Sequence, residues 1–77
     1  PDRCAEARRY YEKGVRVEAL PARLELIAKA VELCPNMPEA RNDLGDCYER
    51  AGLSALYEGD TPEAYRNFDK AVYHYKR

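Results

Sequence analysis

The sequence contains no tryptophan and only one histidine, one phenylalanine and one methionine among 77 residues. The single histidine, His74, lies between Tyr73 and Tyr75, and no spacing places an acid or a nucleophile beside it. Acid–base and nucleophilic catalysis both need such a partner within hydrogen-bond reach. Carboxylate pairs such as Asp43 and Asp46 are typical of a solvated helix face. We therefore expect no enzymatic activity.

Long apolar runs and an excess of charge of one sign are also missing. No apolar run approaches the roughly 18 residues that a membrane span requires. The 13 basic and 14 acidic residues are interspersed and give a net charge of -1, so the chain lacks the basic stripe typical of nucleic-acid binding. These features exclude a membrane span and a nucleic-acid partner. A chain of this length forms one domain, 1–77, and buries only about 60 to 65% of its unfolded surface.

The three cysteines show neither a CxxC motif nor a histidine-rich spacing, which argues against zinc and redox sites. We expect no cofactor and no metal. Pro1 is not an initiator residue and no signal peptide is visible, which indicates a processed product or a piece of a longer chain.

Prolines and glycines divide the chain into four expected helices, with no strand. The first helix runs from Arg3 to Gly14, a glycine suited to a helix C-terminus. The second begins at Pro21 and the third at Pro38, since proline is tolerated in the first turn. The last runs from Pro62 toward Lys76, with Ala64, Phe68, Ala71, Val72 and Tyr75 turned inward. Short turns between the helices predict an all-α, antiparallel stack.

Small and large residues recur at spacings that let antiparallel helices nest closely. They are Ala30, Pro35, Leu44, Gly45, Tyr48, Gly52, Ala64, Phe68 and Ala71. At these positions the chain resembles the tetratricopeptide repeat family, whose unit is a helix-turn-helix of 34 residues. The resemblance implies two repeats, about 1–37 and 38–77, and a binding scaffold. A glycine inside a helix costs about 1 kcal/mol relative to alanine, so we expect Gly45 to admit the backbone of the next helix.

The chain departs from the family pattern at Arg41, where a large aromatic is favoured, and at Arg23, where alanine is usual. Eleven residues separate Gly52 from Ala64, where the family has four. The excess is close to two helical turns, about 10 Å of rise. It predicts a longer third helix, through Leu53, Leu56 and Tyr57. We expect its overhanging end to be covered by a satellite cluster with Val15, Val17 and Leu20.

Two readings of the cysteines remain open. In an antiparallel hairpin the start of the first helix lies beside the end of the second, so Cys4 and Cys34 can come within the Cα separation of about 4.4 to 6.8 Å that a disulfide needs. Alternatively both are buried thiols that act as small hydrophobes. The first reading suits a periplasmic or secreted domain and the second a cytoplasmic one, so the localisation is unknown. Cys47 is expected in the core.

The concave surface of such a stack comes from the first helix of each repeat. Here it would consist of Arg8, Tyr11, Glu12, Asn42, Asp46, Glu49 and Arg50. The resemblance implies binding of an extended or helical peptide there. The set of lysines, arginines and asparagines that clamps a terminal carboxylate in some family members is lacking, so we expect a basic or mixed-charge protein partner.

Seven tyrosines are a large aromatic load for this length. Tyr10, Tyr48 and Phe68 are expected in the core. Tyr65, Tyr73 and Tyr75 lie on the last helix, which has no successor to cover its outer face, and exposed tyrosines at a stack end indicate an interface. The alternative function is therefore a structural module that self-associates through these three tyrosines as a homo-oligomer.

Overall fold

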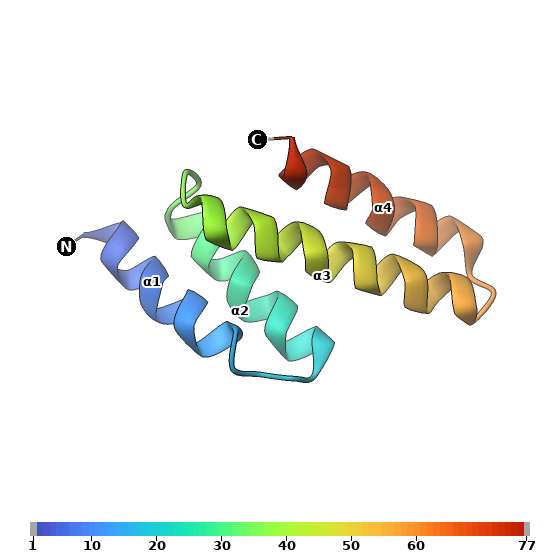
Figure 1. The fold of residues 1–77 in the computed structure, drawn as a ribbon, viewed down its shortest axis with the longest axis horizontal. Helices are drawn as coiled ribbons and strands as arrows, with labels where there is room; N and C mark the ends of the chain where they lie inside the picture. The colour runs from blue at the N-terminus through green and yellow to red at the C-terminus, as the bar shows by residue number, and fades with distance from the viewer. Residues whose placement is uncertain (1, 77) are drawn as a thin grey trace.

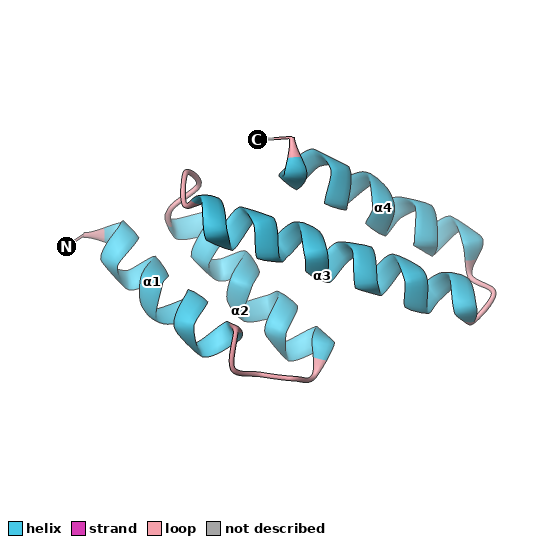
Figure 2. Cartoon of the chain, in the orientation of Figure 1, coloured by secondary structure: helices cyan, strands magenta, loops and turns pink. Residues whose placement is uncertain are grey.

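The computed structural model describes residues 2–76, which form four α-helices and no strand (Figure 1 and Figure 2). The helices are α1 (Arg3–Gly14), α2 (Leu20–Leu33), α3 (Pro38–Tyr57) and α4 (Thr61–Tyr75). This confirms the all-α, antiparallel stack of four helices. The third helix does continue through Tyr57, as the excess residues predict.

Local side chains explain where the helices begin. The Asp2 carboxylate accepts hydrogen bonds from the backbone N–H of Cys4 at 2.9 Å and of Ala5 at 3.3 Å, which satisfies two free donors of α1. A proline lies in the first turn of each of the other three helices, where the missing N–H costs no hydrogen bond.

The turn between α3 and α4 is short because a glycine stops one helix and an aspartate starts the next. Gly59 has a φ of +85°, and its N–H donates to the Leu56 carbonyl at 3.0 Å. The Asp60 N–H donates to the Ala55 carbonyl at 2.8 Å, which completes a Schellman motif. The Asp60 carboxylate then accepts from the Glu63 N–H at 3.2 Å and caps α4.

Each helix packs mainly on its neighbours in sequence, and the described chain measures 44 × 25 × 14 Å. Figure 1 shows the two hairpins, α1 with α2 and α3 with α4, and α3 running past the end of α2. The buried cluster lies where α2 meets α1 and α3. Its members are Ala7, Ile27, Ala30, Val31, Cys34, Met37, Ala40 and Leu44.

Glycines let the two helices of each hairpin approach closely. A Cβ on Gly14 would lie 2.7 Å from Ile27 Cδ1, and a Cβ on Gly52 would lie 2.5 Å from Phe68 Cε1. Gly45 differs from the expectation, because the atoms beside it belong to the ring of Tyr75, at 2.7 Å, and not to the backbone. Its missing side chain therefore makes room for an aromatic ring from α4.

The predicted satellite cluster is wrong. The overhanging end of α3 is exposed, and Tyr57 retains 94% of its accessible surface. The last turns of α3 run past the end of α2, whereas the connection from Val15 to Ala19 joins the end of α1 to the start of α2 and does not reach the end of α3 (Figure 1). Val15 packs against the main core instead.

Candidate protein-interaction surface

The predicted concave surface begins where α1 meets the start of α3. Arg8 Nη2 lies 3.0 Å from Glu39 Oε2, and the Arg8 guanidinium lies 5.7 Å from the centre of the Tyr11 ring. Burial raises the pKa of the Tyr11 hydroxyl, and the carboxylate of Asp43 adds to the rise. The pKa of Glu39 is lowered by a backbone hydrogen bond and by Arg8. Arg8 and Tyr11 therefore help to hold α1 against α3.

The α3 part of the surface is a row of polar side chains on one face of the helix. Asp46 pairs with Arg50 at 3.1 Å, and the Glu49 carboxylate accepts a hydrogen bond from the Tyr75 hydroxyl at 3.1 Å. Burial and the Glu49 carboxylate together raise the pKa of Tyr75 to about 12. Asn42 on this helix and Glu12 on α1 are exposed.

Four further residues belong to this surface although they were absent from the predicted set. Glu39 and Asp43 contribute the carboxylates that meet α1. Leu53 and Tyr57 continue the row of Asn42, Asp46 and Glu49 at spacings of three and four, so the same face of α3 turns from polar to apolar along its length. That spacing is visible in the sequence, but we expected those two side chains to be covered.

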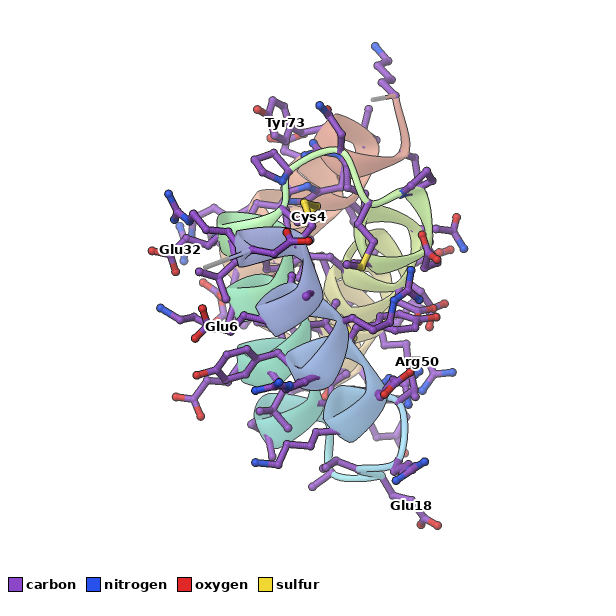
Figure 3. The ribbon with its side chains drawn as sticks, turned by 90° about the vertical axis from the view of Figure 1, so that its left-hand side faces the viewer. Cys4, Glu6, Glu18, Glu32, Arg50 and Tyr73 are labelled. Atoms are coloured by element: carbon purple, nitrogen blue, oxygen red, sulfur yellow. A yellow bond between two sulfur atoms is a disulfide. The ribbon has the colours of Figure 1, made fainter. Side chains whose placement is uncertain are left out.

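The three tyrosines of α4 do not form one patch. The Tyr75 ring packs beside Gly45 and its hydroxyl bonds to Glu49, so this residue links α4 to α3. Tyr73 lies near the C-terminal end of α4 (Figure 3), with the Arg41 guanidinium 5.7 Å from its ring centre. Tyr65, about two turns earlier, is 64% exposed. Val72 was expected to face inward, but it is half-exposed.

Arg41 is a buried charge, only 9% exposed, at the position where the resembled family favours an aromatic. Its Nη1 donates to the Pro35 carbonyl at 3.2 Å and its Nη2 donates to His74 Nδ1 at 3.3 Å. The His74 ring stacks on Tyr48, with centres 5.7 Å apart. Arg41 therefore ties the turn between α2 and α3 to the end of α4.

The structure joins Cys4 and Cys34 by a disulfide, with Cα atoms 4.9 Å apart (Figure 3). The bridge links the start of α1 to the end of α2. Cys47 is a free thiol with no exposed surface, as expected for a core residue, and burial raises its pKa. Within residues 2–76, no group of three or more histidine, cysteine, aspartate or glutamate side chains is placed to hold a metal ion.

The outer side of the first hairpin carries a separate depression. It is lined by Tyr10, Glu25, Leu26, Ala28, Lys29 and Glu32. Tyr10 is partly buried here and packs against the core from its other side. None of these lining residues belongs to the predicted concave surface.

Comparison with known proteins gives a limited match. A curated relative, "Photosystem I assembly protein Ycf3" of Cyanophora paradoxa, is 35% identical over 54 residues, which is 70% of this chain and 31% of the relative. The chain thus spans less than a third of the length of that protein. No family model matches the chain. No solved structure matches it. Among the described residues, none of the helices has the length and apolar character needed to traverse a bilayer.

Proposed function

We propose that this chain is a non-catalytic protein–protein interaction module of the tetratricopeptide type, built from two repeats. The proposal rests on the row of exposed and partly exposed side chains along α3, from Asn42 through Asp46 and Glu49 to Leu53. This row stands on a helix that packs against α2 and α4, so tertiary contacts hold its backbone in place before a partner binds. Preorganisation of that kind lowers the entropic cost of association.

The chemistry of the row favours a basic or mixed-charge protein segment. Asp46 and Glu49 present carboxylates, and the exposed leucine beyond them offers apolar contact area. The similarity to an assembly protein is consistent with a role in bringing proteins together. We place the binding residues at Arg8, Tyr11, Glu12, Asn42, Asp46, Glu49 and Arg50.

A capture experiment with charge-reversed variants tests this function. The tagged chain carrying a photo-cross-linker at Asn42 is compared with the same protein carrying Asp46→Lys and Glu49→Lys. A protein that is cross-linked by the first and lost with the second supports the proposal. Glu6→Lys with Glu32→Lys changes the net charge equally at two exposed positions elsewhere and must leave the cross-link intact. Equal capture by all three proteins would contradict the proposed surface.

A second candidate is self-association through the tyrosines of α4, chiefly Tyr65 and Tyr73, because Tyr75 is bonded to Glu49 of α3. The exposure of Tyr65 and Tyr73, each more than half accessible, favours it. Light scattering over a range of concentrations measures the oligomeric state directly. A dimer that dissociates on Tyr65→Glu with Tyr73→Glu supports this function, and a monomer at every concentration excludes it.

A further inference from the structure

The two hairpins correspond position by position, and the glycine contacts set the register. In each hairpin a glycine of the first helix faces a large side chain of the second: Gly14 faces Ile27, and Gly52 faces Phe68. The sequence alignment that pairs Gly14 with Gly52 also pairs Arg8 with Asp46 and Val15 with Leu53. The shift that carries Ile27 onto Phe68 also carries Leu24 onto Tyr65 and Val31 onto Val72.

In the first hairpin these positions lie in the surface on which α3 packs, which we call the covered seat. Val31 shares the buried cluster with Ala40 and Leu44 of α3, and Val15 and Leu24 pack against that cluster. At its edge, Arg8 pairs with Glu39 in the first turn of α3 at 3.0 Å. The first hairpin therefore meets α3 through apolar residues and two charged contacts, since Arg23 of α2 also lies 4.0 Å from Asp43 of α3.

In the second hairpin the corresponding apolar positions are uncovered. Leu53, Tyr65 and Val72 are each half-exposed or more. Scattered exposed hydrophobic residues are ordinary, but a set that repeats a covered helix seat marks an interaction site. We call Asp46, Leu53, Tyr65 and Val72 the open seat.

The other end of the stack does not offer a matching surface. The shift that carries Gly14 onto Gly52 relates Glu6 and Arg9 of α1 to Leu44 and Cys47 of α3, and both α1 residues are exposed. A second copy that placed α1 on the open seat would bury these charges without partners, which is costly. Head-to-tail addition of copies of this chain is therefore disfavoured.

We propose that the open seat binds an amphipathic α-helix of a partner protein that carries a basic residue in its first turn. This rests on the proposed interaction function and names the partner's chemistry. The covered seat has Arg8 opposite Glu39, whereas the open seat has Asp46 in place of Arg8, so the charge required of the incoming helix is reversed. The present partner of Asp46 is Arg50, which is exposed, and water can solvate it when a new cation takes its place.

The helix that fills the covered seat supplies the probe. A synthetic peptide of residues 37–53 with Glu39→Lys is compared with the same peptide that keeps Glu39, and both carry Cys47→Ala to prevent oxidation. We expect the lysine peptide to bind about three- to ten-fold more tightly, the range for replacing a like-charge contact by a partly exposed ion pair. Asp46→Lys in the protein should invert this preference.

Nuclear magnetic resonance titration locates the binding and supplies the controls. We expect shifts at Leu53, Tyr65 and Val72, and at least about ten-fold weaker binding for Val72→Lys, which places an ammonium group in the apolar seat. Val72 is half-exposed, so this variant should keep the fold. Glu6→Lys, on the outer face of α1, should bind like the unmodified protein.

Three results would overturn the proposal: equal affinity for the two peptides, shifts confined to residues outside the open seat, or a homodimer that Val72→Lys dissociates, since a second copy would then occupy the seat. Failure of the helix seat alone can be distinguished from failure of the proposed interaction function. A cross-linked partner that is lost with Asp46→Lys and Glu49→Lys but retained with Val72→Lys would leave the interaction surface intact and refute the helix seat.

Discussion

Removing the Cys4–Cys34 disulfide should cost this chain much of its stability. The bridged cysteines are 30 positions apart in sequence. In the chain-entropy description, a crosslink closing a loop of that size stabilises the folded state by about 3 to 4 kcal/mol. For a domain of this length, each kcal/mol moves the melting temperature by about 4 to 8 °C. Reduction should therefore lower the melting temperature by roughly 12 to 30 °C.

The assay combines intact mass with thermal unfolding followed by circular dichroism. Reduction should add about two daltons and produce the fall in melting temperature, and Cys4→Ser with Cys34→Ser should reproduce that fall without reductant. Adding reductant to this variant is the control, because Cys47 is unpaired and the midpoint should stay where it is. An unchanged mass, or melting temperatures of the two forms within about 3 °C, would refute the reasoning.

Three further perturbations test other parts of the structure. Tyrosine absorbance during alkaline titration should show Tyr75 with a pKa of about 12, and this pKa should move toward 10 in Glu49→Gln. Because the pKa of Tyr75 is raised in the folded state, the stability that this group contributes is present below pH 10 and is lost as the pH rises through 12. A titration unchanged by Glu49→Gln would contradict this. Asp60→Ala removes the cap of α4 and should lower the free energy of unfolding by about 1 kcal/mol in urea denaturation, whereas Asp69→Ala on the exposed side of that helix should have little effect. Gly52→Ala should lower the free energy of unfolding by about 1 kcal/mol or more, since the overpacking cost against Phe68 is only partly offset by helix propensity. Ser54→Ala, a change at an exposed position of the same helix, should be neutral or stabilising. A stabilised Gly52→Ala variant would show that the Phe68 ring moves aside.

The course of the helices could be predicted because each boundary has a local cause. Gly14 ends one helix, and Pro38 and Pro62 lie in the first turns of two others, so no long-range information was needed. The length of α3 followed from the residue count between Gly52 and Ala64. The exposure of its end did not follow, since the direction taken by the connection after Gly14 depends on how α1 and α2 cross.

The candidate surface shows the same division between local and tertiary information. The row along α3 follows from helical periodicity alone, but the hydrogen bond from Tyr75 to Glu49 depends on the register between α3 and α4. Arg41 could be recognised as a departure from the family pattern, yet its burial against His74 requires the whole stack to be in place. The opposite charges of Arg8 and Asp46, which occupy corresponding positions, could be interpreted only once the contact of Arg8 with Glu39 was known.

The disulfide also decides how the molecule would respond to tension. A pull applied at the two ends of the chain cannot extend the segment between Cys4 and Cys34, because the load passes through the bridge. About 100 Å of contour length is thereby withheld, at roughly 3.3 Å for each extended residue. Of the four helices, only α3 and α4 can unravel, and those two carry the exposed apolar residues of the proposed interaction surface. Force would therefore disrupt the proposed surface on α3 and α4 while the first hairpin keeps its topology.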